Sequence, residues 1–450
     1  MDKTIAEKRQ FLRIPATLPI RITPEFLGET VDLSETGLRF MLQKPLFLFK
    51  AQAQIELSPE ESIDTEFRVI WNKHLVQEGK FIYGACFIGL KERDLSNLRY
   101  ILIKSHLDQI LSKVDNVKDK EKIRDFWCID FKSYMDRLPT ISNMLEQGFN
   151  RDEAFKQVFD FNETIMKKGD ELESSIDNRI VMKKIKKTFR ELCGPWVYKS
   201  DIVKHALEKP RGYPGDYKLL EIIYNNQTIS YGIGFCYDKY FLNNPYSIAV
   251  RNRKEKMSEI LKEFIEYLPF SHKKILNLAC GSCREIKKLF DGDGFIRDKE
   301  VVFTLVDQDE KALEFSREIL RNNPKNVSFK FLQHNILDYI KEGRKNSKLL
   351  GRQNMIYSIG LADYLPDRVL KNLLLFCFNL LEPKGKLVIA HKDVNKYKPL
   401  PPDWWCDWTF YPRDENYLLN LVTKSGIENF SLRLTREPSE IILFLEVERA

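Results

Sequence analysis

The stretch Lys273–Glu285, which reads KKILNLACGSCRE, decides how the second half of the chain folds. Apolar residues lead into small residues around Gly281, and an amphipathic pattern follows at Ile286, Leu289 and Phe290. This order predicts a buried strand, a tight turn and a helix. Ligands of open α/β sheets bind beyond the carboxyl ends of strands, beside such turns and the free N–H groups of the following helix. The single glycine does not match the G-x-G-x-x-G dinucleotide pattern, which disfavours a nicotinamide oxidoreductase.

A second apolar run, Phe303–Asp309, ends in a carboxylate. Asp307 can accept two O–H hydrogen bonds there, which suits a ribose diol. A small-residue turn followed by an acid that closes the next strand resembles class I S-adenosylmethionine (SAM) methyltransferases. Later segments fall in the order of that family: Phe329–Asp338 as the third strand and adenine-contacting turn, Met355–Leu361 as the fourth strand, Leu381–Ala390 as the fifth, and 430–434 with 441–447 as the terminal antiparallel hairpin.

This resemblance covers roughly residues 250–450 and implies an α/β Rossmann-like seven-stranded methyltransferase sheet with SAM as cofactor. It implies cofactor contacts from Asn277, Ala279, Gly281, Asp307, Gln308, Asn335, Ile336, Ser358 and Gly360. The chain departs from the family at Asn277, where an acid is usual, at Ala279 and Cys283, where glycines are usual, and at Asn354, where an Asp is usual.

Composition bounds the remaining possibilities. The 450 residues suffice for two or three domains, and the net charge of +7 is a mild excess that does not by itself indicate nucleic acid. The polar N-terminus predicts no signal peptide, and the longest apolar run, Leu373–Leu381, is too short to span a bilayer. The eight cysteines lack metal-ligand spacing. We interpret Cys280 and Cys283 as small packing residues rather than as redox or zinc ligands, and predict no metal and a reducing cytoplasm.

The N-terminal part alternates in the manner of short strands. Four runs predict strands near 38–42, 53–57, 66–71 and 81–87, and leucines and isoleucines at helical spacing predict a helix over 95–111. Together they indicate a small antiparallel β-barrel followed by a helix. The predicted division is 1–114 for the barrel with its helix, 115–250 for a helical linker or cap region that opens with a charged linker, and 251–450 for the methyltransferase domain.

Two motifs lie at the start of this barrel, Arg9–Arg13 (RQFLR) and Asp32–Gly37 (DLSETG). Complete R-x-x-x-R and [DN]-x-S-x-x-G motifs in this order resemble the PilZ domain, a bacterial receptor for cyclic di-GMP. The resemblance implies cyclic di-GMP binding by Arg9, Arg13, Asp32, Ser34 and Gly37. A guanidinium fork meets the O6 and N7 acceptors of guanine bidentately, which agrees with that ligand. The alternative is a solvated arginine arm beside an ordinary turn.

The loop Lys209–Tyr217 (KPRGYPGDY), the pair Arg251 and Arg253, and the segment Gly360–Leu365 sharpen the resemblance. They resemble bacterial methyltransferases of extracellular-factor synthesis, which make 3-hydroxypalmitic acid methyl ester. We predict substrate contacts from Arg211, Tyr213, Asp216, Arg251 and Asp363, and catalytic roles for Tyr364, His391 and Arg253. Asp363 and Tyr364 follow the fourth predicted strand, and His391 follows the fifth. The alternatives are a rigid turn at the loop, a packing role for Tyr364 and a structural histidine at 391.

The leading hypothesis is a cyclic di-GMP-responsive SAM-dependent methyltransferase that O-methylates a small-molecule or fatty-acid carboxylate. A carboxylate is already ionised and needs only a cationic clamp, from Arg211, Arg251 or Arg253, whereas a hydroxyl or amine would need a base such as His391. We expect the arm that bears Arg9 and Arg13 to become ordered on the nucleotide and to alter access to the cofactor. The alternative is a non-catalytic cyclic di-GMP effector that uses a degenerate methyltransferase fold to dock a partner.

Overall fold

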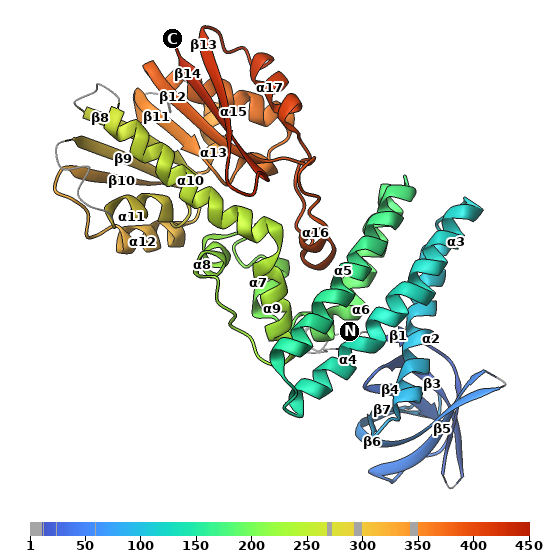
Figure 1. The fold of residues 1–450 in the computed structure, drawn as a ribbon. Helices are drawn as coiled ribbons and strands as arrows, with labels where there is room; N and C mark the ends of the chain where they lie inside the picture. Colours follow the sequence, from blue (N-terminus) through green and yellow to red (C-terminus); the bar gives the residue numbers. More distant parts are fainter. Residues whose placement is uncertain are drawn as a thin grey trace. The chain divides into compact units, whose positions relative to one another are not determined.

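The computed structural model describes residues 11, 13–23, 25–58, 60–267, 272–291, 299–342 and 350–450. Internal packing divides the chain into two compact units (Figure 1). The first comprises Met1–Asp201 with Ser230–Tyr237, and the second comprises Ile202–Ile229 with Asp238–Ala450. Each unit has its own sheet and its own hydrophobic core. The domain boundaries expected near residues 114 and 250 stay predictions.

The first unit begins with the predicted barrel. Its strands are β1 (Ile14–Pro15), β2 (Pro19–Ile22), β3 (Phe26–Ser34), β4 (Gly37–Leu42), β5 (Lys50–Ser58), β6 (Glu61–Leu75) and β7 (Lys80–Ile88). Within the described residues, β2 to β7 close an antiparallel ring in the order β3-β2-β5-β6-β7-β4, which returns to β3, while β1 pairs with β3 alone. Ring closure leaves no long unpaired edge. Alternate residues, such as Ile20 and Ile22 on β2, fill the interior.

Helices complete this unit. They are α2 (Glu92–Leu111), α3 (Val117–Asp125), the π-helix η1 (Phe126–Phe131), α4 (Lys132–Glu146), α5 (Arg151–Ser175) and α6 (Arg179–Val197). Helix α2 buries Leu98 and Leu102 in the barrel core. The charged segment after residue 115, predicted as a linker, is helical instead. The side chain of Asn116 caps α3 by accepting two backbone N–H groups, and Trp127 of η1 is fully buried.

The second unit is built on a sheet with strand order β10-β9-β8-β11-β12-β14-β13. The strands are β8 (His272–Leu278), β9 (Glu300–Asp307), β10 (Val327–Gln333), β11 (Gln353–Ser358), β12 (Leu381–Lys392), β13 (Phe430–Arg436) and β14 (Ile442–Arg449). Only β14 and β13 break the parallel pattern, as an antiparallel hairpin on β12. The chain runs outward from β8 on one side and from β11 on the other, so a crevice forms at the carboxyl ends of these two strands.

The helices of the second unit cover the sheet and shape that crevice. They are α7 (Asp201–Glu208), α8 (Tyr217–Asn225), α9 (Ile233–Asn243), α10 (Pro245–Tyr267), α11 (Arg284–Phe290), α12 (Glu310–Ile319), α13 (Ile336–Glu342), the 3₁₀ turn η2 (Ala362–Tyr364), α15 (Asp367–Leu380), α16 (Leu400–Cys406) and α17 (Glu415–Thr423). Two of these helices are divided between the units. Helix α7 has only its first residue, Asp201, in the first unit, and α9 belongs to the first unit up to Tyr237 and to the second unit from Asp238. No helix in the described ranges is both long and apolar enough to cross a membrane.

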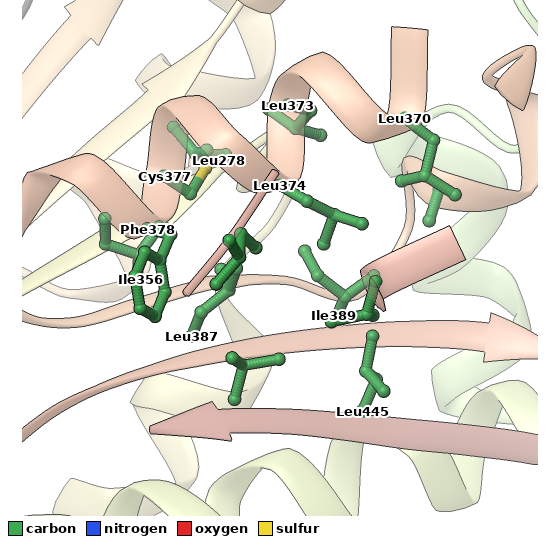
Figure 2. Close-up of a cluster of buried hydrophobic side chains, with 14 of the residues drawn as sticks. Leu278, Ile356, Leu370, Leu373, Leu374, Cys377, Phe378, Leu387, Ile389 and Leu445 are labelled. Carbon is green, nitrogen blue, oxygen red and sulfur yellow. The ribbon is translucent and has the colours of Figure 1, made fainter. Parts of the chain in front are cut away.

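The core between α15 and the sheet explains the apolar run that the sequence shows there. Figure 2 shows the buried side chains of α15 beside those of the strands. The helix contributes Leu370, Leu373, Leu374, Cys377 and Phe378, and the strands contribute Leu278, Ile356, Leu387, Ile389 and Leu445. The helix residues recur at helical spacing, which gives α15 one apolar face. The predicted fold class, a PilZ-like barrel, a helical middle and a Rossmann-like methyltransferase sheet, is confirmed.

Candidate functional site

The turn after β8 has the conformation that its small residues allow. Ala279, Gly281 and Cys283 all have positive φ angles, of 54°, 55° and 51°. Such angles favour glycine, so the two non-glycine residues are held there by the surrounding structure. A side chain at Gly281 would have no atom within 4 Å, so this position faces open space. The glycine is favoured here by the positive φ angle and not by a lack of room.

Asp307 ends β9 and connects two turns. Its Oδ2 accepts a hydrogen bond from the N–H of Gly281 at 2.8 Å, and its Oδ1 accepts one from the N–H of Asp309 at 2.9 Å. Burial raises the pKa of this carboxyl group, and backbone hydrogen bonds from Asp309, Gly281 and Gln308 oppose that shift. A carboxylate has about four acceptor sites, so Asp307 keeps capacity to accept from a ligand hydroxyl.

These residues open onto a cavity of about 300 Å³ in the crevice of the second unit. It brings together seven of the nine predicted cofactor residues: Ala279, Gly281, Asp307, Gln308, Asn335, Ile336 and Gly360. The predicted acceptor-side residues Tyr213 and Tyr364 line the same cavity. The sequence prediction did not name the other lining residues individually, although all but Leu220 lie in segments that it assigned to the site: Pro214, Gly215, Tyr217, Leu220, His334, Leu337, Leu361 and Leu365.

Two predicted cofactor residues, Asn277 and Ser358, are not among the residues that line the cavity. The amide nitrogen of Asn277 donates to Glu285 Oε1 at 3.0 Å and to the hydroxyl of Tyr357 at 2.9 Å. The hydroxyl of Ser358 donates to the carbonyl of Leu278 at 2.8 Å. Both side chains therefore support the strands beneath the cavity.

The loop between α7 and α8 forms one wall of the cavity and is held at both ends. Arg211 Nη1 pairs with Asp309 Oδ1 at 3.2 Å. Asp216 caps α8 by accepting the N–H of Leu219 at 3.0 Å, and its other oxygen contacts His205 Nε2 at 2.8 Å. Arg211 and Asp216 thus position the loop, while Tyr213 reaches the cavity.

Tyr364 lines the cavity, whereas Arg253 does not and lies behind Gly360 of its wall. The Arg253 side chain is buried, interacts with the hydroxyl of Tyr224, and has an Nε atom with no partner among the described residues. Its Nη2 atom lies 3.9 Å from the position that a side chain at Gly360 would take. The hydroxyl of Tyr364 accepts a hydrogen bond from Trp408 Nε1 at 2.8 Å, and burial raises its pKa.

The remaining predicted residues, His391, Asp363 and Arg251, are engaged elsewhere. His391 is 1% exposed, its Nδ1 lies 2.6 Å from the carbonyl of Lys392, and its Nε2 accepts from Arg413 at 3.0 Å. Burial lowers the pKa of His391. Asp363 accepts the N–H of Lys392 at 3.0 Å, and Arg251 donates to backbone carbonyls. None of the three is among the residues that line the cavity.

Lys392 is a buried cation that the sequence reasoning did not single out. It is 2% exposed, and its Nζ has no hydrogen-bond partner within the described part of the chain. The ammonium lies over the ring of Phe410, 2.9 Å from the centroid, and near the ring of Tyr246. Burial lowers the pKa of Lys392 to about 7, with Asp363 opposing the shift. Phe410 packs against Tyr364, which connects this cation to the cavity wall.

The barrel motifs form a second, separate candidate site. Arg13 Nη1 pairs with Asp32 Oδ1 at 2.7 Å, and Arg39, not predicted from the sequence, pairs with Oδ2 of the same carboxylate. Ser34 donates to the carbonyl of Gly37 at 3.1 Å. A side chain at Gly37 would collide with the carbonyl of Ala85 on β7, so this glycine also serves strand packing. Arg9 lies outside the described residues.

Glu35, inside the second motif, connects the barrel to the helices of the same unit. Its Oε2 pairs with Arg99 Nε of α2 at 2.7 Å, and both side chains are buried. Arg99 also contacts Asp136 of α4 at 3.4 Å and lies 5.8 Å from the ring centroid of Trp196 in α6. Phe11, from the first motif, packs edge-on against the same Trp196 at 5.4 Å.

The cysteines and acidic residues give no indication of a metal site. Cys280 and Cys283 are buried and unpaired, and burial raises the pKa of both thiols. Among the residues that the structure describes, no three His, Cys, Asp or Glu side chains gather closely enough to hold a metal ion.

Residues 7–104 match the family model of the PilZ domain. The comparison with curated proteins gave no match. Many solved structures are similar to parts of the chain, including the following three. A possible exported protein from Bordetella parapertussis is 14% identical over 55% of this chain and 86% of its own, with a TM-score of 0.40. Magnesium protoporphyrin IX methyltransferase from Synechocystis with bound SAM is 11% identical over 46% of this chain and 85% of its own, with a TM-score of 0.33. The inhibitor of motility of Bacillus subtilis is 22% identical over 22% of this chain and 52% of its own, with a TM-score of 0.21.

Proposed function

We propose that this protein is a SAM-dependent methyltransferase that responds to cyclic di-GMP and methylates a carboxylate oxygen of a small molecule or fatty acid. One observation supports the enzymatic half above all others. Residues predicted to contact the cofactor and residues predicted to contact the acceptor line one cavity, at the point where the strand order of the sheet reverses.

The cavity walls suit a nucleoside with a charged tail. Asp307 retains acceptor capacity for a ribose diol, and Asn335 with Ile336 offers polar and apolar surface for the base. Gly360 leaves room next to Arg253 and Tyr364, where the acceptor would enter. At this end the bound SAM supplies an electrophilic methyl group on a sulfonium, a good leaving group.

The residues around the acceptor favour an anion. Because both ring nitrogens of His391 are engaged and the pKa of Tyr364 is raised, neither side chain is suited to remove a proton. Arg253 is buried with an unpartnered Nε and can clamp an ionised carboxylate, which needs no base. The role of the protein is then to hold the acceptor oxygen in line with the methyl group and to exclude water.

The match of residues 7–104 to the PilZ family supports cyclic di-GMP as the regulatory ligand. Arg13 is tied to Asp32 in this structure, and a guanine that engages Arg13 would compete for that ion pair. The same motif holds Arg99 through Glu35, and Arg99 reaches α4 and α6. Ligand binding at the motif can therefore change helix packing within the first unit.

The test combines binding with turnover. Calorimetry with SAM should give a saturable isotherm, and Asp307→Ala should weaken the affinity about 100-fold or more, since it removes two charged hydrogen bonds to the ribose. Asp291→Ala, which changes an exposed carboxylate of the same unit, should leave the affinity unchanged. Circular dichroism would check that both variants remain folded.

Turnover is measured as transfer of a labelled methyl group from SAM to 3-hydroxypalmitate and to shorter 3-hydroxy acids, with and without cyclic di-GMP. We expect carboxyl methylation whose rate changes with the nucleotide. SAM binding without transfer to any acid would favour the non-catalytic effector instead, and equal SAM affinity in Asp307→Ala would contradict the proposed cofactor site.

A further inference from the structure

The loop between β4 and β5 displays three consecutive apolar side chains. Phe47 is 89% exposed, Leu48 is 43% exposed and Phe49 is 80% exposed. Isolated apolar residues on a protein surface are ordinary, but a continuous run with two phenylalanines is a costly exposure that marks interaction sites.

The backbone of this loop is firmly anchored, so the exposure is built into the fold. Leu46 is buried in the barrel core, and its N–H donates to the hydroxyl of Tyr83 at 2.6 Å. The carbonyl of Phe49 accepts the N–H of Val69 on β6 at 2.9 Å. The barrel therefore holds the three apolar side chains out from its surface.

Two further exposed apolar side chains lie on the neighbouring strand β6. Ile70 is 59% exposed and Trp71 is 41% exposed, directly after the residue that bonds to Phe49. The ring of Trp71 lies on Gly84 of β7, where a larger residue would collide with it. Tryptophan is favoured where an apolar surface meets water, since the ring is apolar and its N–H is polar.

Cations flank this apolar surface on both sides. Lys44 precedes the loop, Lys50 follows it, and Arg68 pairs with Lys50 across the β5–β6 ladder. All three are exposed and have no ion-pair partner within the described ranges. No Asp or Glu occurs between Glu35 and Glu56, so the segment that contains the loop carries only positive charge.

We propose that residues 44–50, with Ile70 and Trp71, dock the barrel onto a bilayer surface that contains anionic lipids. Phe47, Leu48 and Phe49 would enter the outer acyl region while Lys44 and Lys50 contact the headgroups. Consecutive side chains of an extended loop point in different directions. Fluid hydrocarbon can surround all of them, whereas a rigid groove in a protein partner covers one face. This docking does not depend on the proposed methyl transfer.

Co-sedimentation of the full chain with vesicles tests the proposal. We expect the protein to bind phosphatidylcholine vesicles that contain about one third phosphatidylglycerol. Its partition coefficient onto vesicles of phosphatidylcholine alone should be lower by at least about tenfold. The double variant Phe47→Ser/Phe49→Ser should lower partition onto the anionic vesicles at least about tenfold, since each buried phenylalanine contributes strongly. Lys44→Gln/Lys50→Gln should also lower it about tenfold, and added salt should weaken the wild type.

Ile180→Ser is the matched control, because Ile180 is also 80% exposed but lies on α6, away from the loop. It should bind vesicles like the wild type, and cyclic di-GMP titration would show that the loop variants retain a folded barrel. Failure of the wild type to bind anionic vesicles would overturn the proposal. So would a loop variant that binds vesicles normally but shifts the oligomeric state in light scattering, because the loop would then be an interface between copies of the chain.

Discussion

The two candidate ligand sites differ in how the chain builds them. The barrel site rests on two short motifs, and its central carboxylate, Asp32, is balanced by Arg13 and Arg39. The cavity of the second unit draws its walls from separate segments between Tyr213 and Leu365. Two buried cations behind its wall, Arg253 and Lys392, each keep a nitrogen without a hydrogen-bond partner among the described residues.

This difference separates a site that is electrostatically satisfied before binding from one that is not. At the barrel, an incoming ligand must replace existing ion pairs, so its binding can be transmitted through the groups that it displaces. Behind the cavity wall, the buried cations are already desolvated, so that their desolvation is not a further cost of binding an anionic acceptor. The barrel site therefore suits a switch, and the cavity suits substrate binding.

The largest effect is expected where the barrel switch meets the helices. Arg99→Met leaves Glu35 buried without its partner, and we expect a loss of about 3 kcal/mol in the free energy of unfolding. Burial already raises the pKa of Glu35, and Arg99 opposes that shift. When the pKa of a carboxyl group is higher in the folded than in the unfolded state, the free energy of unfolding falls as the pH rises. The loss of stability in Arg99→Met should therefore be larger at pH 8 than at pH 5. Urea unfolding at the two pH values measures it.

Two further variants make this test specific. Arg137→Met removes an exposed arginine of α4 and should change stability by less than about 0.5 kcal/mol. Adding Glu35→Gln to Arg99→Met removes the uncompensated charge and should recover part of the loss. If Arg99→Met unfolds like the wild type at both pH values, the buried pair is not the connection that we infer.

The next effect concerns the nucleotide itself. Arg13→Ala should weaken cyclic di-GMP binding about 30-fold, or about 2 kcal/mol, because a guanidinium fork to guanine is lost. Stability should change by less than about 1 kcal/mol, since the Arg13 side chain is partly exposed and Arg39 still pairs with Asp32. Calorimetry with Arg21→Ala, an exposed arginine on β2, serves as the control. An unchanged affinity in Arg13→Ala would refute the receptor role.

A smaller effect of opposite sign is expected at the cavity. Lys392→Met should stabilise the protein by about 1–2 kcal/mol, because it replaces a buried cation with an apolar side chain. The pKa of Lys392 is lowered to about 7 in the folded state, so below that pH the folded protein carries the full cost of a buried charge. This cost decreases as the pH rises toward the pKa of an unfolded lysine. The gain from the substitution should thus be larger at pH 6 than at pH 10. Thermal unfolding across this range measures it, and a destabilised variant at pH 6 would contradict the argument.

Much of the fold could be predicted because its signals are local. The apolar run and turn around Gly281 and the acid at 307 define a strand, a turn and a second strand within a few residues. The same holds for Asp32–Gly37 in the barrel. By contrast, β2 was not predicted, because its alternation lasts only four residues and begins with a proline. Strand β3 was not predicted, because glycine and charged residues interrupt its apolar pattern. The helix α3 was taken for a linker because its surface is almost entirely charged.

Side-chain roles were harder to predict than positions. Asn277 occupies the expected place on β8, but its amide serves Glu285 and Tyr357. Arg39 and Lys392 belong to no sequence motif. The fold places Arg39 beside the carboxylate of Asp32 and Lys392 over aromatic rings, and these contacts indicate their roles. Such contacts join residues far apart in the sequence, so no local pattern reports them.

The smallest effect is expected at His391, and it tests how the acceptor is activated. His391→Gln should lower the rate of methyl transfer less than about tenfold and leave its dependence on pH unchanged, because the imidazole is held by Lys392 and Arg413 and does not line the cavity. Tyr364→Phe, which changes a residue of the cavity wall, is the comparison and should have the larger effect. Loss of the alkaline-rising part of the pH–rate profile in His391→Gln would identify a general base, and the acceptor would then be a hydroxyl or amine that must lose a proton, since an ionised carboxylate gives a base nothing to remove.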